Sequence, residues 1–361
     1  MNQRDRTNRP AFRGIIFEVT SRCNLSCGYC YNIHKGPLGI SAADGGYGRA
    51  KAVLKQLFRV ADVERVTMSG GEPFMQDRFL ELVLYCRMKG KRVVIITNGT
   101  KGTDEEYKQL VSMGVTLFEL PLHSTVPNDH DDMTGVPGSH TRVLSSIQTL
   151  RALGAKVVPV IVVTKRNADR IQETLRFLKE LGLPRIMMNR FNIGGSGIAN
   201  AKALSLSIAE LRQVFHDASD TAVRLNLNLS SNVCSPVCVL DGRDFPGIRY
   251  SRCSPDMSRR SLTMDLAGNL RFCNHSPINM GNIYTDEIRR VVSSDYAAGW
   301  KQRPTFCAGC DKWTRCFGGC RAASEQLGQS VLEVDPILQP LDFGMSTSND
   351  VSSGAKISTH P

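Results

Sequence analysis

Short apolar runs alternate with longer amphipathic stretches between Gly14 and about Asn192, and this alternation restricts the fold more than any other feature of the chain. The runs with strand character are Gly14–Thr20, Arg65–Met68, Arg92–Thr97, Thr116–Leu120, Lys156–Val163 and Ile186–Asn189. The stretches with helical character are Arg49–Val60, Asp77–Lys89, Asp104–Met113, Thr141–Leu153 and Ala168–Leu181. Repeated strand–helix units predict a parallel sheet with helices outside it. Six units are too few for a closed eight-fold barrel, so we expect an α/β fold that forms a partial (β/α)6 TIM-like barrel.

Regular periodicity fades after Asn232, where cysteines become frequent. Before that point, Gly194–Gly197 is interpreted as a loop that leaves the barrel, and Ser207–Ala218 as a helix. The expected parts are an N-terminal extension at 1–13, the barrel at 14–198, a connecting helical segment at 199–232, a loop-rich cysteine domain at 233–339 and a polar tail at 340–361. We expect the cysteine domain to depend on metal clusters and the tail to be disordered.

The 12 cysteines of the chain fall into two groups. Cys23, Cys27 and Cys30 lie near the N-terminus, and eight more lie in the last third of the chain. Cys86 stands alone in a helical pattern and is interpreted as a buried structural thiol. The first residues are polar, and no apolar run approaches the roughly 20 residues that span a bilayer. We therefore expect a cytoplasmic protein whose clustered cysteines serve metal binding or catalysis rather than disulfides.

The first cysteine group reads Cys23-Asn-Leu-Ser-Cys27-Gly-Tyr-Cys30 and directly follows the first predicted strand. A [4Fe–4S] cluster usually takes four cysteines, so three local thiolates would leave one iron open to a small molecule. An open metal position is also what separates catalytic from structural zinc sites. The alternative is a zinc site with a distant fourth ligand such as His34, although structural zinc sites usually have paired CxxC halves.

This CxxxCx(aromatic)C pattern, with Tyr29 at the aromatic position, resembles the signature of the radical S-adenosylmethionine (SAM) superfamily. Further motifs follow the next three strands in the order of that family. They are Ser69-Gly70-Gly71-Glu72-Pro73, Thr97-Asn98-Gly99 and His123-Ser124. In a barrel, such motifs meet at the C-terminal ends of the strands.

The resemblance implies that the three thiolates hold a [4Fe–4S] cluster and that SAM chelates its open iron. It also implies that Glu72 accepts the SAM amino group, while the neighbouring glycines let the backbone approach the ligand. The other residues that it places at the cofactor are Tyr29, Ser69, Gly70, Gly71, Pro73, Asn98, His123 and Ser124.

The C-terminal cysteines resemble the SPASM extension, or the related twitch, which carries auxiliary [4Fe–4S] clusters on radical SAM enzymes. The resemblance implies one auxiliary cluster on Cys253, Cys273 and Cys320, and another on Cys307, Cys310 and Cys316. The chain lacks the further cysteine that normally follows this dense group, so we expect one or two auxiliary clusters. We favour Cys238 as the fourth ligand of the first cluster and leave Cys234 unassigned. A pair of zinc ribbons is the alternative.

The implied reaction is reductive cleavage of SAM to methionine and a 5′-deoxyadenosyl radical that abstracts a substrate hydrogen. Modification of a ribosomally made peptide or a protein side chain, by crosslink, thioether or oxidation, is the leading hypothesis. One alternative is a dehydrogenase or epimerase for a small molecule such as a sugar or aminocyclitol, and another is a non-catalytic metal-binding protein. The expected partners are a flavodoxin- or ferredoxin-type electron donor and a separate peptide-recognition protein, since little chain precedes Cys23.

His275 is the candidate catalytic base, because imidazole titrates near neutrality. Sulfatase-maturating relatives have an aspartate directly after the second auxiliary cysteine, whereas this chain has Asn274. The acidic run Asp129, Asp131 and Asp132 is interpreted as a solvated loop. The net charge of +11 is spread without a basic block, which favours a solvated surface and argues against a nucleic-acid or membrane partner.

Overall fold

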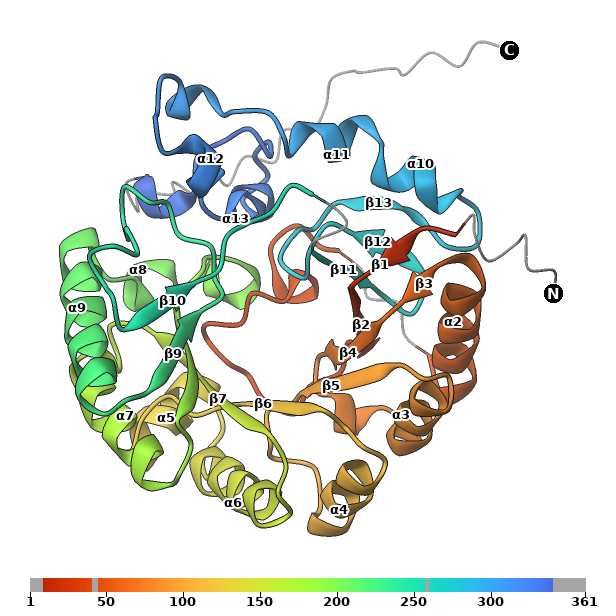
Figure 1. Cartoon of the computed structure of the whole chain (residues 1–361), viewed down its shortest axis with the longest axis horizontal. Helices are drawn as coiled ribbons and strands as arrows, with labels where there is room; N and C mark the ends of the chain where they lie inside the picture. Colours follow the sequence, from red (N-terminus) through yellow and green to blue (C-terminus); the bar gives the residue numbers. More distant parts are fainter. Residues whose placement is uncertain (1–8, 41–44, 257–259, 340–361) are drawn as a thin grey trace.

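The computed structural model describes residues 9–40, 45–256 and 260–339. In this part of the chain, strands form one curved sheet in the order β10-β9-β8-β7-β6-β5-β4-β2-β11-β12-β13. The two outer strands, β10 and β13, do not pair with each other, so the sheet is an open ring (Figure 1). The partial α/β barrel expected from the sequence is therefore confirmed.

The six predicted strands are all present and parallel, each beside its neighbour in chain order. They are β2 (Gly14–Thr20), β4 (Arg65–Gly70), β5 (Arg92–Ile96), β6 (Leu117–Pro121), β7 (Val157–Val163) and β8 (Arg185–Arg190). Alternate residues of each strand point to opposite faces. One set, such as Ile15, Val66 and Val93, is buried under the helices, and the other set, such as Ile16, Thr67 and Val94, lines a cavity inside the ring.

The helices lie on the outside of the ring, as Figure 1 shows. Those of the barrel and the connecting segment are α2 (Tyr47–Val60), α3 (Phe79–Met88), α4 (Asp104–Ser112), α5 (Pro127–Thr134), α6 (Ser139–Ala152), α7 (Ile171–Glu180), α8 (Ala201–Leu204) and α9 (Ile208–Arg224). The expected helices are found within a few residues of their predicted bounds, and α9 extends beyond its predicted end. Helix α5 was not expected, because its residues were interpreted as an acidic loop.

The sheet is wider than the six predicted strands. Strands β9 (Asn228–Ser231) and β10 (Ile248–Tyr250) continue it in parallel beyond β8. On the other side, β11 (Ser261–Met264) runs parallel to β2, and β12 (Asn269–Arg271) and β13 (Asn279–Asn282) follow antiparallel. A small separate pair joins β1 (Ala11–Phe12) to β3 (Asp62–Val63). The sequence did not indicate these strands, which have two to four residues each and carry many polar side chains.

The C-terminal region contains short helices, α10 (Ile288–Val292), α11 (Asp295–Gly299), α12 (Trp313–Cys316) and α13 (Arg321–Gln326). In Figure 1, α12 and α13 lie at the opening between β10 and β13, and α10 and α11 lie outside β13. The tail that was expected to be disordered lies outside the described residues. No helix in the described ranges is both long and apolar enough to cross a membrane.

Candidate active site

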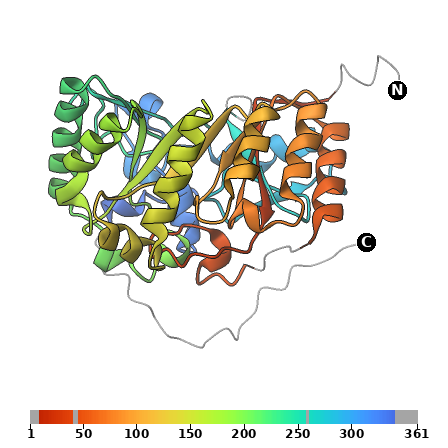
Figure 2. The same cartoon turned by 90° about the horizontal axis from the view of Figure 1, so that it is seen from below.

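The loop after β2 carries the first cysteine group and lies along one edge of the ring, drawn in red in Figure 2. The glycine motif after β4 is hydrogen-bonded to the start of this loop. The Gly71 amide donates to the Thr20 carbonyl at 2.7 Å, and the Glu72 amide donates to the Arg22 carbonyl at 2.8 Å. A Cβ atom at Gly71 would lie 2.1 Å from the Arg22 oxygen. The close approach that requires glycine here is to the cysteine loop itself, a role that the sequence analysis did not foresee.

The Glu72 carboxylate is fully buried and binds the end of the neighbouring strand. It accepts hydrogen bonds from the Thr97 hydroxyl and the Asn98 amide, each at 2.7 Å, and from the Phe74 amide at 3.2 Å. Burial raises the pKa of Glu72 to about 7 despite these donors. A carboxylate has about four acceptor positions, so roughly one is left for a ligand such as an ammonium group.

The Asn98 side chain connects this strand end to the cysteine loop. Its Nδ2 atom donates to Asn24 Oδ1 at 3.0 Å and lies 3.9 Å from the Cys23 sulfur. Its Oδ1 atom accepts from the Thr100 amide at 2.9 Å. Of the other predicted cofactor residues, Ser69 and Gly70 end β4, and Pro73 begins a short 3-10 turn, Pro73–Met75.

Tyr29 and His123 form a hydrogen-bonded pair behind the cysteine loop. His123 is buried, and its Nδ1 atom accepts from the Val162 amide at 3.3 Å, so the ring proton lies on Nε2. Nε2 lies 2.6 Å from the Tyr29 hydroxyl oxygen and donates to it. The Tyr29 hydroxyl in turn hydrogen-bonds to the Cys27 thiol. Burial, together with nearby His130, holds the pKa of His123 well below its usual value, so the ring is neutral.

Ser124, Asp129 and Asp131 have structural roles in this molecule. The Ser124 hydroxyl is fully buried, donates to Asp129 at 3.2 Å and accepts from the Val126 amide at 3.0 Å, at the start of α5. The Asp131 carboxylate accepts from the Gly138 and His140 amides, at 2.5 and 2.7 Å, where α6 begins. The prediction of a loop is therefore wrong, because these residues form helix α5 and the Asp129 and Asp131 carboxylates order the starts of two helices. Asp132 is exposed, as expected.

The three N-terminal thiols lie close enough to interact electrostatically, and burial raises the pKa of Cys27 to about 12. Buried neighbouring thiols suit a metal group, because metal binding removes their protons and the mutual repulsion of thiolates. Within the described ranges, no three Cys, His, Asp or Glu side chains converge on a single metal ion. A cubane does not need such convergence, since each thiolate binds a different iron. His34 faces away from this group, toward Glu18 at 3.8 Å and the Ile40 carbonyl at 3.2 Å, which disfavours the zinc alternative.

The eight C-terminal cysteines separate into two sets of four. The first set lines the cavity inside the ring and consists of Cys234, Cys253, Cys273 and Cys320. The second set interacts electrostatically at the outer side of the same region and consists of Cys238, Cys307, Cys310 and Cys316. The family resemblance favours Cys238 for the first set, whereas the structure places Cys234 there. Cys86 is fully buried on α3, as expected.

The cavity has a volume of about 530 Å³ and is lined by residues from both cysteine loops. Tyr31, next to Cys30, forms part of its wall, and so do the first cysteine set, Glu119 and Arg65. The Tyr31 hydroxyl accepts a hydrogen bond from Asn274 Nδ2 at 2.7 Å. Asn274 follows Cys273, so this bond joins the two cysteine loops directly. Burial raises the pKa of Glu119, although the guanidinium of Arg65 opposes the shift.

His275 also lies on the cavity wall and is almost fully buried. Its Nε2 atom lies 2.9 Å from the Ile193 carbonyl oxygen, so Nε2 carries the proton and Nδ1 is the basic nitrogen. Burial lowers the pKa of His275 to about 4. His275 is thus neutral near pH 7 but a weak base.

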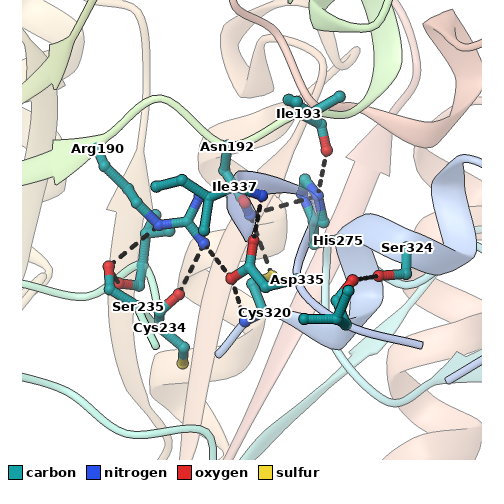
Figure 3. A network of polar contacts seen from close by, with 12 residues as sticks. Arg190, Asn192, Ile193, Cys234, Ser235, His275, Cys320, Ser324, Asp335 and Ile337 are labelled. Atoms are coloured by element: carbon teal, nitrogen blue, oxygen red, sulfur yellow. Dashed lines mark hydrogen bonds and ion pairs between the residues drawn. The ribbon is translucent and has the colours of Figure 1, made fainter. Parts of the chain in front are cut away.

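An ion pair between Arg190 and Asp335 supports the first cysteine set (Figure 3). Arg190 Nη2 donates to Asp335 at 2.5 Å and to the Cys234 carbonyl at 2.9 Å. Asp335 also accepts from the Cys320 amide at 2.7 Å. Asn192 Nδ2 donates to the Cys320 sulfur at 3.1 Å. Sequence reasoning missed this pair, because its members lie far apart in the chain and in no cysteine motif.

The sequence profile of the radical SAM superfamily matches residues 17–178, which include the cysteine loop and the motifs that contact it. The chain carries a radical SAM domain. The radical SAM domain begins in β2 and ends in α7, so it contains five of the six predicted strands.

Proteins similar to the whole chain include two that are named PqqA peptide cyclase. The one from Xanthomonas oryzae pv. oryzae is 25% identical over 345 residues, which cover 92% of this chain and 89% of the relative. The one from Gluconobacter oxydans is 26% identical over 333 residues, which cover 90% of this chain and 89% of the relative. The radical SAM domain and the C-terminal cysteine region thus both lie within the similarity.

Solved structures with the same fold include Streptococcus suis SuiB bound to the precursor peptide SuiA. It has a TM-score of 0.70 and 17% identity, and the match covers 92% of this chain and 76% of SuiB. A structure named anSMEcpe with bound AdoMet has a TM-score of 0.69 and 17% identity, and the match covers 91% of this chain and 94% of anSMEcpe. At 17% identity, these similarities show a shared fold and nothing further.

Proposed function

We propose that the chain is a radical SAM oxidoreductase that modifies a ribosomally made peptide. The observation that carries the proposal is the cavity of about 530 Å³ between the cysteine loop and the first C-terminal cysteine set. A substrate side chain in this cavity would lie between a site that generates a radical and a group that can take an electron. The similarity to proteins named PqqA peptide cyclase, along most of the chain, supports a peptide as the substrate.

In this proposal the thiolates of Cys23, Cys27 and Cys30 hold a [4Fe–4S] cluster with one open iron. When bound, the cluster and SAM supply the reductive cleavage that gives the 5′-deoxyadenosyl radical. Glu72 would use its remaining acceptor position for the SAM amino group and would hold Asn98 against the cysteine loop. We also propose that residues 233–339 form a SPASM-like auxiliary cluster region.

The substrate would lose one hydrogen atom to form 5′-deoxyadenosine, and then one electron and one proton. The first C-terminal cysteine set would hold an auxiliary cluster that can accept this electron, with a one-electron acceptor protein as the final oxidant. Glu119 is a stronger candidate than His275 for the base, because it lines the cavity and burial raises its pKa, whereas burial lowers the pKa of His275 to about 4. A flavodoxin- or ferredoxin-type donor would reduce the barrel cluster, and a separate protein would present the peptide.

The test is anaerobic reconstitution of the full chain, followed by dithionite-dependent cleavage of SAM. We expect 5′-deoxyadenosine from the native chain and from a Cys86→Ala control, and none from the triple variant Cys23→Ala, Cys27→Ala and Cys30→Ala. Equal cleavage by the triple variant would refute the proposed radical chemistry.

The peptide is tested separately, by co-expression with short peptides encoded beside the gene. We expect mass spectrometry to detect a peptide that has lost a pair of hydrogen atoms. Glu119→Gln should abolish this product while SAM cleavage continues, and His275→Gln should retain it. Active SAM cleavage with no change in any such peptide would contradict the peptide assignment.

A further inference from the structure

Cys234 and Cys238 are four residues apart, yet the structure directs them to different places. Cys234 lines the cavity, and its thiol hydrogen-bonds to that of Cys253. Cys238 is exposed and interacts electrostatically with Cys316 and Cys310. The chain between them therefore separates the two C-terminal cysteine sets.

A tight turn fixes the position of Cys238. The Val239 and Leu240 amides both donate to the Pro236 carbonyl at 2.9 Å. Val239 and Leu240 are buried in the hydrophobic core, and Arg212 Nη1 donates to the Val239 carbonyl at 2.9 Å. The turn is thus held by packing and hydrogen bonds that involve no cysteine.

The same turn contacts the dense cysteine group directly. The Val237 amide donates to the Cys316 sulfur at 3.3 Å. A Cβ atom at Gly319 would lie 2.6 Å from the Pro236 ring, so Gly319 lets the two segments meet. A hydrogen bond from a backbone amide to the sulfur is a typical contact of a metal-bound thiolate.

Within the dense group, the backbone brings the remaining thiols together. The Cys310 amide donates to the Cys307 carbonyl at 3.1 Å, which closes a turn between the two thiols. Cys307 interacts electrostatically with Cys316, Cys310 and Cys238. Arg321 is buried and interacts with both Cys253 and Cys307, so its positive charge lies between the two sets.

We propose that Cys238 completes a second auxiliary [4Fe–4S] site with Cys307, Cys310 and Cys316. Cys234 then completes the first site with Cys253, Cys273 and Cys320. A residue upstream of the dense group thereby supplies the ligand that the sequence lacks downstream of it. Both auxiliary sites would have four thiolates and no open iron, so they would carry electrons rather than bind substrate. The exposed position of Cys238 would bring the second site near the surface, where a redox partner can approach.

The inference rests on the proposed iron–sulfur function and is tested by pairs of alanine variants in the full, reconstituted chain. Each cubane brings four irons, so the native chain and a Cys86→Ala control should hold about twelve. Cys238→Ala with Cys316→Ala removes ligands from one site and should leave about eight irons. Cys238→Ala with Cys253→Ala removes ligands from two sites and should leave about four. The assignment would be overturned if Cys238→Ala with Cys316→Ala left about four irons and Cys238→Ala with Cys253→Ala left about eight. About eight irons in the native chain would also overturn it.

A second measurement does not depend on the folding of a variant. In the iron-loaded native chain, iodoacetamide should leave Cys238 unmodified although the residue is exposed, and removal of iron by a chelator should make it reactive. Buried Cys86 should stay unreactive in both states. Alkylation of Cys238 in the iron-loaded chain would overturn the inference. SAM cleavage, measured on the same sample, tests the barrel cluster separately, so loss of one conclusion is distinguished from loss of the other.

Discussion

The Arg190–Asp335 ion pair should contribute strongly to stability, because both side chains are buried. Their exposed fractions are 3% and 1%, and their closest N–O distance is 2.5 Å. Asp335→Asn keeps the shape of the side chain and an oxygen that can accept from the Cys320 amide. It removes the charge opposite Arg190, however. Breaking a buried pair on one side costs about 3–5 kcal/mol, since the remaining charge is uncompensated.

Unfolding of the iron-free chain in urea measures this cost. Both tryptophans of the chain, Trp300 and Trp313, lie in the C-terminal region, so their fluorescence reports on the part that Asp335 supports. We expect Asp335→Asn to lower the free energy of unfolding by about 3–5 kcal/mol. As a control, Glu287→Gln breaks an exposed pair with Arg290 and should change it by less than about 1 kcal/mol.

A double-mutant cycle separates the pair from a general packing defect. Arg190→Met combined with Asp335→Asn removes both charges, so the double variant should be more stable than the sum of the single effects predicts, by about 2 kcal/mol. Additive single effects, or a cost below about 0.5 kcal/mol for Asp335→Asn, would refute the reasoning.

Three further predictions concern the radical SAM domain. Gly71→Ala should abolish SAM cleavage, because a Cβ atom would lie 2.1 Å from the Arg22 oxygen. Gly48→Ala, with no atom within 4 Å of the new Cβ, should leave cleavage intact. Burial lowers the pKa of His130 to about 4, so between pH 6.5 and 4 the unfolded chain binds a proton that the folded chain does not. The free energy of unfolding should therefore decrease as the pH is lowered through this range, by up to about 1.4 kcal/mol per pH unit. The decrease should be less steep in His130→Asn, and thermal unfolding at several pH values measures both. Tyr29→Phe removes a hydrogen bond to Cys27 worth about 1 kcal/mol, so the reduction potential of the barrel cluster should become more negative by about 40 mV. An unchanged potential in an EPR-monitored titration would contradict that role of Tyr29.

The barrel could be predicted because its signals are local. Each of its six strands contains a short group of apolar residues, and the helices between them have clear periodicity. Strands such as β9, Asn-Leu-Ser-Ser, carry no such signal, because they form only where an existing sheet edge offers partners. Helix α5 was hidden by its aspartates, one of which, Asp131, makes its stabilising contacts with the start of the next helix.

The candidate site shows the same limit. The N-terminal cysteine group is compact in sequence, so its spacing indicated a metal site, and its resemblance to the radical SAM signature implied the chemistry. The C-terminal ligand sets depend on how the turn at Pro236 directs Cys238, and cysteine spacing does not encode that direction. Arg190 and Asp335 are separated by 145 positions, and only the folded chain brings them together.

The two cysteine regions are parts of one structure rather than separable modules. Strand β11, from the C-terminal region, pairs with β2 along four residues, and β2 leads directly into the N-terminal cysteine loop. Asn274 bonds to Tyr31 from one cysteine loop to the other, and Gln326 Nε2 donates to the carbonyls of Tyr31 and His275, at 2.9 and 2.8 Å. A change at one cysteine region can therefore displace the other through a short chain of packed and hydrogen-bonded groups. That coupling is what a reaction needs if a radical forms at one end of the cavity and an electron leaves at the other.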